Sequence, residues 1–205
     1  YYARSCIRQN FFPGSEKAFI DILQNDLGRD LLDDPKHSSC TGIGYHSDIV
    51  PLETIMTVVA RQFALMTEAG YEHFVASCIT SFGVYTEILA TWEEFPEMEE
   101  KTRENLFKAT GREFRKPTSL AHTSDIMFHF REEIARKAKH KLVNSLTGEP
   151  LHVVEHIGCH YAKIFPKSGI GGSEFPYVLA GMIESWGGQC VDYPERRHCC
   201  GFGFR

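Results

Sequence analysis

The feature that most constrains this chain is a cysteine and glycine pattern that occurs near both ends of it. Cys40-Thr-Gly-Ile-Gly-Tyr-His46 recurs as Cys199-Cys-Gly-Phe-Gly-Phe-Arg205. Thiolates are strong ligands for zinc and for iron in clusters, so a repeat centred on cysteine indicates a repeated metal site. We therefore expect two related structural units.

The repeat extends upstream of these two segments. Phe12-Pro13 follows Cys6 at the same spacing at which Phe165-Pro166 follows Cys159. The distance from the upstream cysteine to the glycine segment is longer in the second copy, which also holds a Gly-rich stretch from Lys167 to Ser173. Such an insertion is typical of a loop, where added length costs little.

The second copy is expected to be incomplete. Cys78 follows Cys40 in the first copy, and its counterpart in the second would fall beyond Arg205. The chain also begins at Tyr1 rather than at a methionine. We therefore expect the sequence to be a piece of a longer protein, with part of the second site outside it.

Composition and charge exclude several classes of function. The formal net charge of −5 lacks the basic excess expected of a nucleic-acid binder. No apolar run reaches the length of a transmembrane segment. The 7 cysteines stand in a chain without a visible secretory signal, which favours metal binding or redox chemistry over a disulfide scaffold. This pattern predicts a cytoplasmic protein.

Alternating strand and helix patterns predict an α/β fold. A turn at Thr147-Gly-Glu-Pro150 separates two predicted domains, 1–149 and 150–205, each a small, mainly parallel sheet flanked by helices. The predicted strands are 1–5, 73–77, 119–122, 151–157 and 189–193. The predicted helices are 15–27, 51–66, 79–92, 124–144 and 175–186, and the acidic segment 93–100 is interpreted as a solvated helix end.

Three of the cysteines lie where predicted strands end. Parallel sheets carry their sites at the carboxyl ends of strands, and Cys6, Cys78 and Cys159 all fall there. A thiol between a strand end and a helix start has a lowered pKa, because backbone N–H groups and the helix dipole favour the anion. These positions therefore suit the binding of a soft metal.

Residues near the cysteines leave alternatives open. Cys190 lies outside the repeat in a predicted strand, and we interpret it as an inert buried residue. The neighbouring histidines are candidates to complete a zinc site or to orient ligands by hydrogen bonds: His46, His160 and His198. The neighbouring glycines either let the backbone approach a cluster or make tight turns: Gly42, Gly44, Gly201 and Gly203.

A strand-end cysteine, a Cys-Cys-Gly segment and a later cysteine resemble the cysteine-rich CCG domain. This domain occurs twice in the B subunit of heterodisulfide reductases, and also in iron–sulfur subunits of glycolate and lactate oxidation and in a type of succinate dehydrogenase. The heterodisulfide reductase B subunit is the most similar branch, on Cys6-Ile7, on Phe12-Pro-Gly-Ser-Glu16 and on the closing Cys199-Cys-Gly-Phe-Gly. The resemblance covers nearly the whole chain.

The resemblance implies that each complete motif gives five cysteines to a noncubane 4Fe-4S cluster. The second motif then supplies Cys159, Cys199 and Cys200 as cluster ligands, with Cys199 and Cys200 at the catalytic site and a closing Cys-x-x-Cys expected beyond Arg205. The first motif supplies Cys6, Cys40 and Cys78 as metal ligands.

The first motif departs from the family pattern at two positions. Thr41 stands in place of the second cysteine of the pair, and Ser81 in place of the last cysteine of Cys-x-x-Cys. The remaining three cysteines leave zinc or an incomplete cluster open as alternatives.

The resemblance implies an iron–sulfur redox subunit of a heterodisulfide reductase, or of a similar sulfur-oxidising complex. The expected substrates are disulfides, thiols or carrier-bound sulfane sulfur, and the expected partners are a ferredoxin-like iron–sulfur subunit and a flavoprotein subunit. Any membrane association is expected to come through such partners. The alternative is a zinc-stabilised electron-relay or docking subunit of a CCG-containing dehydrogenase complex, of the glycolate or lactate oxidase or succinate dehydrogenase type. A metal-free thiol oxidoreductase using Cys199 and Cys200 ranks last, because adjacent cysteines seldom form an unstrained disulfide.

Overall fold

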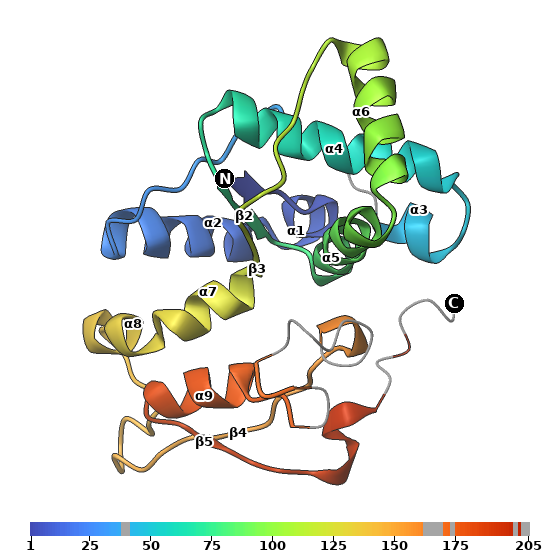
Figure 1. Cartoon of the computed structure of the whole chain (residues 1–205). Helices are drawn as coiled ribbons and strands as arrows, with labels where there is room; N and C mark the ends of the chain where they lie inside the picture. Colours follow the sequence, from blue (N-terminus) through green and yellow to red (C-terminus); the bar gives the residue numbers. More distant parts are fainter. Residues whose placement is uncertain (38–41, 162–169, 173–174, 199–200, 202–205) are drawn as a thin grey trace. The chain divides into compact units, whose positions relative to one another are not determined.

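The computed structural model describes residues 1–37, 42–161, 170–172, 175–198 and 201 (Figure 1). The chain divides into two compact units. Unit 1 consists of Tyr1–Asn25 and Arg29–Thr123, and unit 2 of Asp26–Gly28 and Ser124–Arg205. The main boundary along the chain thus falls between residues 123 and 124, whereas the sequence placed the domain boundary at residues 149 and 150. The assignment of the two motif copies to two CCG domains stays a prediction.

Unit 1 is built on a parallel sheet of order β1-β2-β3. The strands are β1 (Tyr2–Ala3), β2 (His73–Ala76) and β3 (Ser119–His122). The register pairs Ala3 with Ala76 and Ala76 with His122, so these three residues form a row across the carboxyl edge of the sheet. This arrangement confirms the predicted α/β class with small parallel sheets flanked by helices.

Helices cover both faces of this sheet. Tyr2 stacks on Phe19 of α2, with ring centroids 5.6 Å apart. Successive strand residues point to opposite faces, and Phe74 accordingly packs with Phe63 of α4 and Tyr85 of α5. The helices of this part of the chain are α1 (Cys6–Phe11), α2 (Pro13–Asp21), the π-helix η1 (Ile22–Asp26), α3 (Gly42–His46), α4 (Leu52–Glu68), α5 (Ile79–Glu94) and α6 (Pro96–Thr110).

Aromatic residues dominate the core of unit 1. Phe63 lies at its centre and contacts rings from β2, α5 and the segment after α6. Aromatic side chains bury large apolar areas, and pairs at these separations add further attraction. The largest fully buried side chains include Tyr2, Met56, Phe63, Phe74, Phe82, Tyr85, Ile88, Trp92 and Leu106.

Unit 2 contains a second, shorter parallel pair of strands. β4 (His152–Val153) pairs with β5 (Gln189–Cys190), and α9 (Val178–Ser185) packs against β5. The remaining elements are α7 (Thr123–His129), which begins at the boundary, α8 (Arg131–Lys137) and the 3-10 helix η3 (Pro194–Arg197).

The structure corrects several predicted elements. The acidic segment 93–100 is not a single helix end, because Pro96 begins a separate helix, α6. The predicted helix 124–144 is divided into α7 and α8 at Phe130, whose ψ of 10° lies outside the helical range, and it ends at Lys137 rather than at residue 144. The predicted strand 151–157 is paired only at His152 and Val153. None of the helices in the described residues has the length and apolar character needed to cross a membrane.

Candidate metal centre

Two cysteines of the first motif lie at the carboxyl edge of the sheet in unit 1. Cys6 follows β1 as the first residue of α1, and Cys78 follows β2 as the N-cap of α5. Cys6 is exposed and Cys78 is half-buried. The first N–H groups of a helix have no partner within the helix, so they attract an anion placed beside them. Both thiols therefore stand at the same edge of the sheet, each where a strand gives way to a helix.

Gly42, two residues after Cys40 in the sequence, lies against the helix that Cys78 caps. A Cβ atom on Gly42 would lie 2.8 Å from Cγ2 of Thr80 and 3.4 Å from the backbone nitrogen of Ser81. The start of α3 therefore rests on the first turn of α5, two residues after Cys78. Cys40 and Thr41 directly precede Gly42 and lie outside the described residues. The close approach supplies a packing reason for a glycine at this position.

Ser81 occupies the position where the resemblance expects the fifth cysteine, the last of Cys-x-x-Cys. It is buried in the first turn of α5, one helical turn after Cys78. Its hydroxyl is a much weaker ligand for soft metals than a thiolate. The described part of the first motif thus places Cys6 and Cys78 at one edge of the sheet and Gly42 beside the first turn of α5, with a serine in place of a further thiol.

The structure adds two residues that the sequence did not single out. His122 ends β3 in the same row as Ala76, and burial together with Arg8 lowers the pKa of its ring to about 4. Arg8 donates from Nη1 to the Ser77 carbonyl and to Thr123 Oγ1, both at 3.3 Å. The predicted strand 119–122 already placed a histidine at a strand end, which was a usable signal.

In unit 2, Cys159 of the second motif follows the segment that leaves β4 and is half-buried. Tyr161 fixes the chain just after it, because its hydroxyl donates to Asp125 at 2.5 Å and accepts from the Ile170 backbone N–H at 3.0 Å. Glu155, just before Cys159, forms an ion pair with Arg196 of η3.

Cys199 and Cys200 come three and four residues after Arg196 and lie outside the described residues. Gly201, the glycine of the Cys-Cys-Gly segment, has a φ of 81°. That left-handed conformation favours glycine, which explains a glycine directly after the cysteine pair.

The remaining candidate residues, three histidines and Cys190, differ in exposure and in the charges near them. His46 and His198 are exposed, and His160 is half-buried. Cys190 lies in β5, where burial and the nearby Glu184 and Asp192 raise the pKa of its thiol. A raised pKa disfavours the thiolate, which fits the interpretation of Cys190 as unreactive.

The donor chemistry of both motifs fits a soft metal or an iron–sulfur cluster. Thiols begin helices or follow strands, and the Gly42 contact leaves no room for a side chain where α3 meets α5. No group of three or more His, Cys, Asp or Glu side chains with metal-binding geometry occurs within the residues the structure describes. Three of the six predicted ligands, Cys40, Cys199 and Cys200, lie outside those residues, so the ligand sets stay predictions.

Comparison with known proteins finds similarity to B subunits of heterodisulfide reductases. The chain is 30% identical over 198 residues to the B subunit of a ferredoxin:CoB-CoM heterodisulfide reductase of Methanosarcina mazei. It is 29% identical over 200 residues to the B subunit of a ferredoxin/F(420)H(2)-dependent CoB-CoM heterodisulfide reductase of Methanosarcina acetivorans. A second B subunit from that organism, of a ferredoxin:CoB-CoM heterodisulfide reductase, is 25% identical over 210 residues. No family model matches the chain.

These similarities extend along almost the entire chain but not along the entire relatives. They cover 97 to 98% of this chain and 63 to 64% of the relatives. The chain thus spans slightly less than two thirds of the length of these relatives.

Proposed function

This chain is a homologue of the B subunit of heterodisulfide reductases, and from that premise we propose that it is an iron–sulfur redox subunit of a heterodisulfide reductase or a similar sulfur-oxidising complex. The proposed substrates are disulfides, thiols or carrier-bound sulfane sulfur. The observation that carries the proposal is the similarity to B subunits along nearly the whole chain, together with the cysteine pattern that occurs in both halves of it. A cytoplasmic location remains a prediction.

We assign the second motif to a noncubane 4Fe-4S cluster. Cys159, Cys199 and Cys200 would be among its ligands. When bound, such a cluster supplies single electrons and an iron site that accepts sulfur. Reduction of a disulfide consumes two electrons and two protons and releases two thiols. The electrons would come from a ferredoxin-like iron–sulfur subunit or a flavoprotein subunit of the complex.

In support of this proposal, described residues fix the chain after Cys159 and join the segments that precede Cys159 and Cys199 in the sequence. Tyr161 fixes the backbone after Cys159 through Asp125 and Ile170. Arg196 holds the segment before Cys199 to Glu155 on the segment before Cys159. Two stretches of chain that are distant in sequence are thereby kept at a fixed spacing, which is what ligands of a common cluster require.

The test is the metal content of full-length protein purified without oxygen. We expect about four irons and four sulfides per second-motif cluster. EPR should show a signal that changes when a thiol substrate is added, and that is lost when Cys159 is replaced by alanine. Absence of both iron and acid-labile sulfide from the intact protein would remove the redox function.

A second candidate function has its own observation in its favour. Ser81 is buried where a cysteine ligand is expected, and Thr41 replaces another. Three thiols suit a structural zinc ion with one further ligand. On this alternative the chain is a zinc-stabilised electron-relay or docking subunit of a CCG-containing dehydrogenase complex, of the glycolate or lactate oxidase or succinate dehydrogenase type.

The metal content of variants at the first-motif cysteines distinguishes the two proposed functions. Cys6→Ala and Cys40→Ala should remove zinc and leave iron and activity intact if the first motif is a structural zinc site. Loss of iron in these variants would instead place an incomplete cluster there. Zinc as the sole metal of the intact protein would favour the docking function.

A further inference from the structure

We infer that Glu16 is a positioning residue for the first motif: its buried carboxylate ties together the residues that directly precede Cys6 and Cys78. This inference rests on the proposed function in one respect, that these two cysteines bind a metal. Glu16 belongs to α2, outside the cysteine pattern itself. Its role follows from the bonds that a single carboxylate oxygen accepts.

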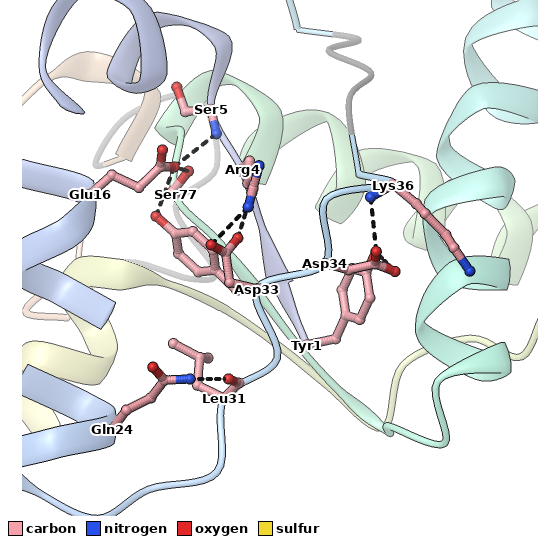
Figure 2. A network of polar contacts seen from close by, with 11 residues as sticks. Tyr1, Arg4, Ser5, Glu16, Gln24, Leu31, Asp33, Asp34, Lys36 and Ser77 are labelled. Atoms are coloured by element: carbon pink, nitrogen blue, oxygen red, sulfur yellow. Dashed lines mark hydrogen bonds and ion pairs between the residues drawn. The ribbon is translucent and has the colours of Figure 1, made fainter. Parts of the chain in front are cut away.

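Glu16 lies inside unit 1 and is 7% exposed. Its Oε1 atom accepts hydrogen bonds from the Tyr2 hydroxyl at 3.0 Å, from the Ser5 backbone N–H at 3.3 Å and from Ser77 Oγ at 3.4 Å. Figure 2 shows the carboxylate between the Ser5 and Ser77 segments. One oxygen thus joins β1, the start of α1 and the end of β2.

Two of these donors stand next to cysteines. Ser5 precedes Cys6 and caps α1, because its hydroxyl accepts from the Arg8 backbone N–H at 3.2 Å. Ser77 precedes Cys78, and its backbone N–H donates to the Ala3 carbonyl at 3.1 Å. The carboxylate therefore sets the separation between the two chain segments that carry the thiols.

The backbone carbonyl of Ser77 is also hydrogen-bonded. Arg8 donates to that carbonyl from Nη1 at 3.3 Å, and from Nη2 to the Ser15 carbonyl at 3.0 Å. The residue before Cys78 is thus bound through its side chain, its N–H and its carbonyl. Such a site holds a ligand in a narrow range of geometries, as residues behind metal ligands do.

Burial makes a purely packing role for Glu16 a poor explanation. Glu16, Phe19 and Leu23 share the buried stripe of α2 and η1, where an apolar residue would pack without losing hydration. A buried carboxylate is costly unless it is well bonded. Its hydrogen bonds go to Ser5 and Ser77, which directly precede the two cysteines. The carboxylate therefore stabilises the positions of these two chain segments.

The experiment compares Glu16→Ala with Glu16→Gln in the full-length protein. Protein purified without oxygen is stripped of metal by chelation, and iodoacetamide modification of Cys6 and Cys78 is followed separately by mass spectrometry. Co²⁺ is then added, and the thiolate-to-cobalt absorption measures binding at the first motif. Cys6→Ala and Cys78→Ala identify the part of that absorption that belongs to this site.

We expect Glu16→Ala to be modified several-fold faster at both cysteines and to bind Co²⁺ roughly tenfold more weakly. Glu16→Gln keeps an acceptor oxygen and should restore most of both properties. Ser77→Ala loses the Glu16 bond beside Cys78 and keeps the Glu16 bond to the Ser5 backbone N–H, so it should speed modification of Cys78 more than of Cys6. This small substitution also keeps the test decisive if Glu16→Ala does not fold.

Leu106→Ala is the control for general destabilisation, because Leu106 is fully buried in α6 and takes no part in these bonds. Equal modification rates in wild type and Glu16→Ala, or the same changes in Leu106→Ala at a similar loss of stability, would overturn the inference. A wild-type protein without the cobalt signal would instead contradict metal binding at the first motif. The modification rates of the metal-free protein would still decide the role of Glu16.

Discussion

The ring of His37 lies beside Tyr1 and Phe74 with 2% of the residue exposed. Neither ring nitrogen has a hydrogen-bond partner among the described residues. Burial, aided by the charge of Arg61, lowers the pKa of the ring from 6.5 to about 4. In the unfolded chain the ring returns to water and to its ordinary pKa.

This difference predicts an acid-sensitive step in stability. Because the folded pKa lies below the unfolded one, the contribution is complete above pH 6.5 and is lost as the pH falls through about 4. Between pH 7 and pH 5 we expect the free energy of unfolding to fall by about 2 kcal/mol from this residue. His37→Leu should remove that part of the slope in urea unfolding, and exposed His152→Gln should not. An unchanged slope in His37→Leu would show that the buried ring is not responsible.

A second prediction concerns the close packing of Gly42 against Thr80. Gly42→Ala should cost about 1–3 kcal/mol, because the new methyl group meets Thr80 Cγ2 at 2.8 Å. Adding Thr80→Ser removes that Cγ2 and should recover part of the loss. Gly14→Ala is the matched control, since a Cβ there meets nothing within 4 Å. Urea unfolding of these variants forms the test, and equal effects at both glycines would contradict it.

At the residue scale, the sequence alone was enough to pick out the cysteines as candidate ligands. It did not reveal the residues that position these cysteines. The cysteines were visible because they recur with glycine at fixed spacing. Glu16 was not, because its role depends on Ser5 and Ser77, which only the fold brings together. A carboxylate on the apolar stripe with Phe19 and Leu23 was the available sign.

At the scale of elements, an ion pair joins the two chain segments that carry the second motif. Glu155 lies between β4 and Cys159, and Arg196 lies between β5 and Cys199. Their side chains are 1% and 18% exposed. Arg196 also donates to Asp192. The second oxygen of Glu155 is buried without a partner in the described part of the chain, so the carboxylate depends on Arg196.

Breaking this pair should therefore be costly. Arg196→Met leaves a buried charge and should lower the free energy of unfolding by about 3–5 kcal/mol. Adding Glu155→Met removes that charge and should recover much of the loss, as a double-mutant cycle would measure. Iron per chain should follow the same order. Glu68→Gln, in the more exposed pair with Arg112, should cost no more than about 1 kcal/mol. A similarly small effect of Arg196→Met would refute the assigned role.

Elements were predictable where local signals agree with packing. The strand at 119–122 was predicted with the same bounds as β3, and β2 differs by one residue. The helix boundary at Pro96 was missed because acidic residues read equally as the end of α5 or as the first turn of α6. Pro96 was the available sign, because proline favours the first position of a helix, and the packing of α6 against α4 and α5 agrees with it.

At the scale of the molecule, burial is uneven between the two units. The large hydrophobic cluster, from Tyr1 to Phe114, lies within unit 1. The described buried apolar residues of unit 2 are fewer and more scattered, among them Ile134, Ile157, Tyr161 and Val178. Regions with dense buried contacts open least often.

Hydrogen exchange should therefore be slowest in β2, α4 and α5. We expect the amides of β4 and β5 to exchange faster, and α9 to fall between these groups. Mass spectrometry of exchanged peptides measures this order directly. Uniform protection across both units would show that they unfold together and would contradict the expectation.

Bonds that involve no cysteine side chain hold the carboxyl edge of the sheet together. Backbone pairing joins Ala3, Ala76 and His122, and the Glu16 carboxylate joins Ser5 and Ser77. On the proposed function, the residues that hold the first motif in place and the residues that bind its metal could therefore change independently during evolution. Serine and cysteine differ by one atom, so a lineage can lose or regain a ligand at Ser81 without building a new fold. On the proposed function, the surrounding fold would stay the same among descendants, while the residues at 41 and 81 would decide which metal each of them binds.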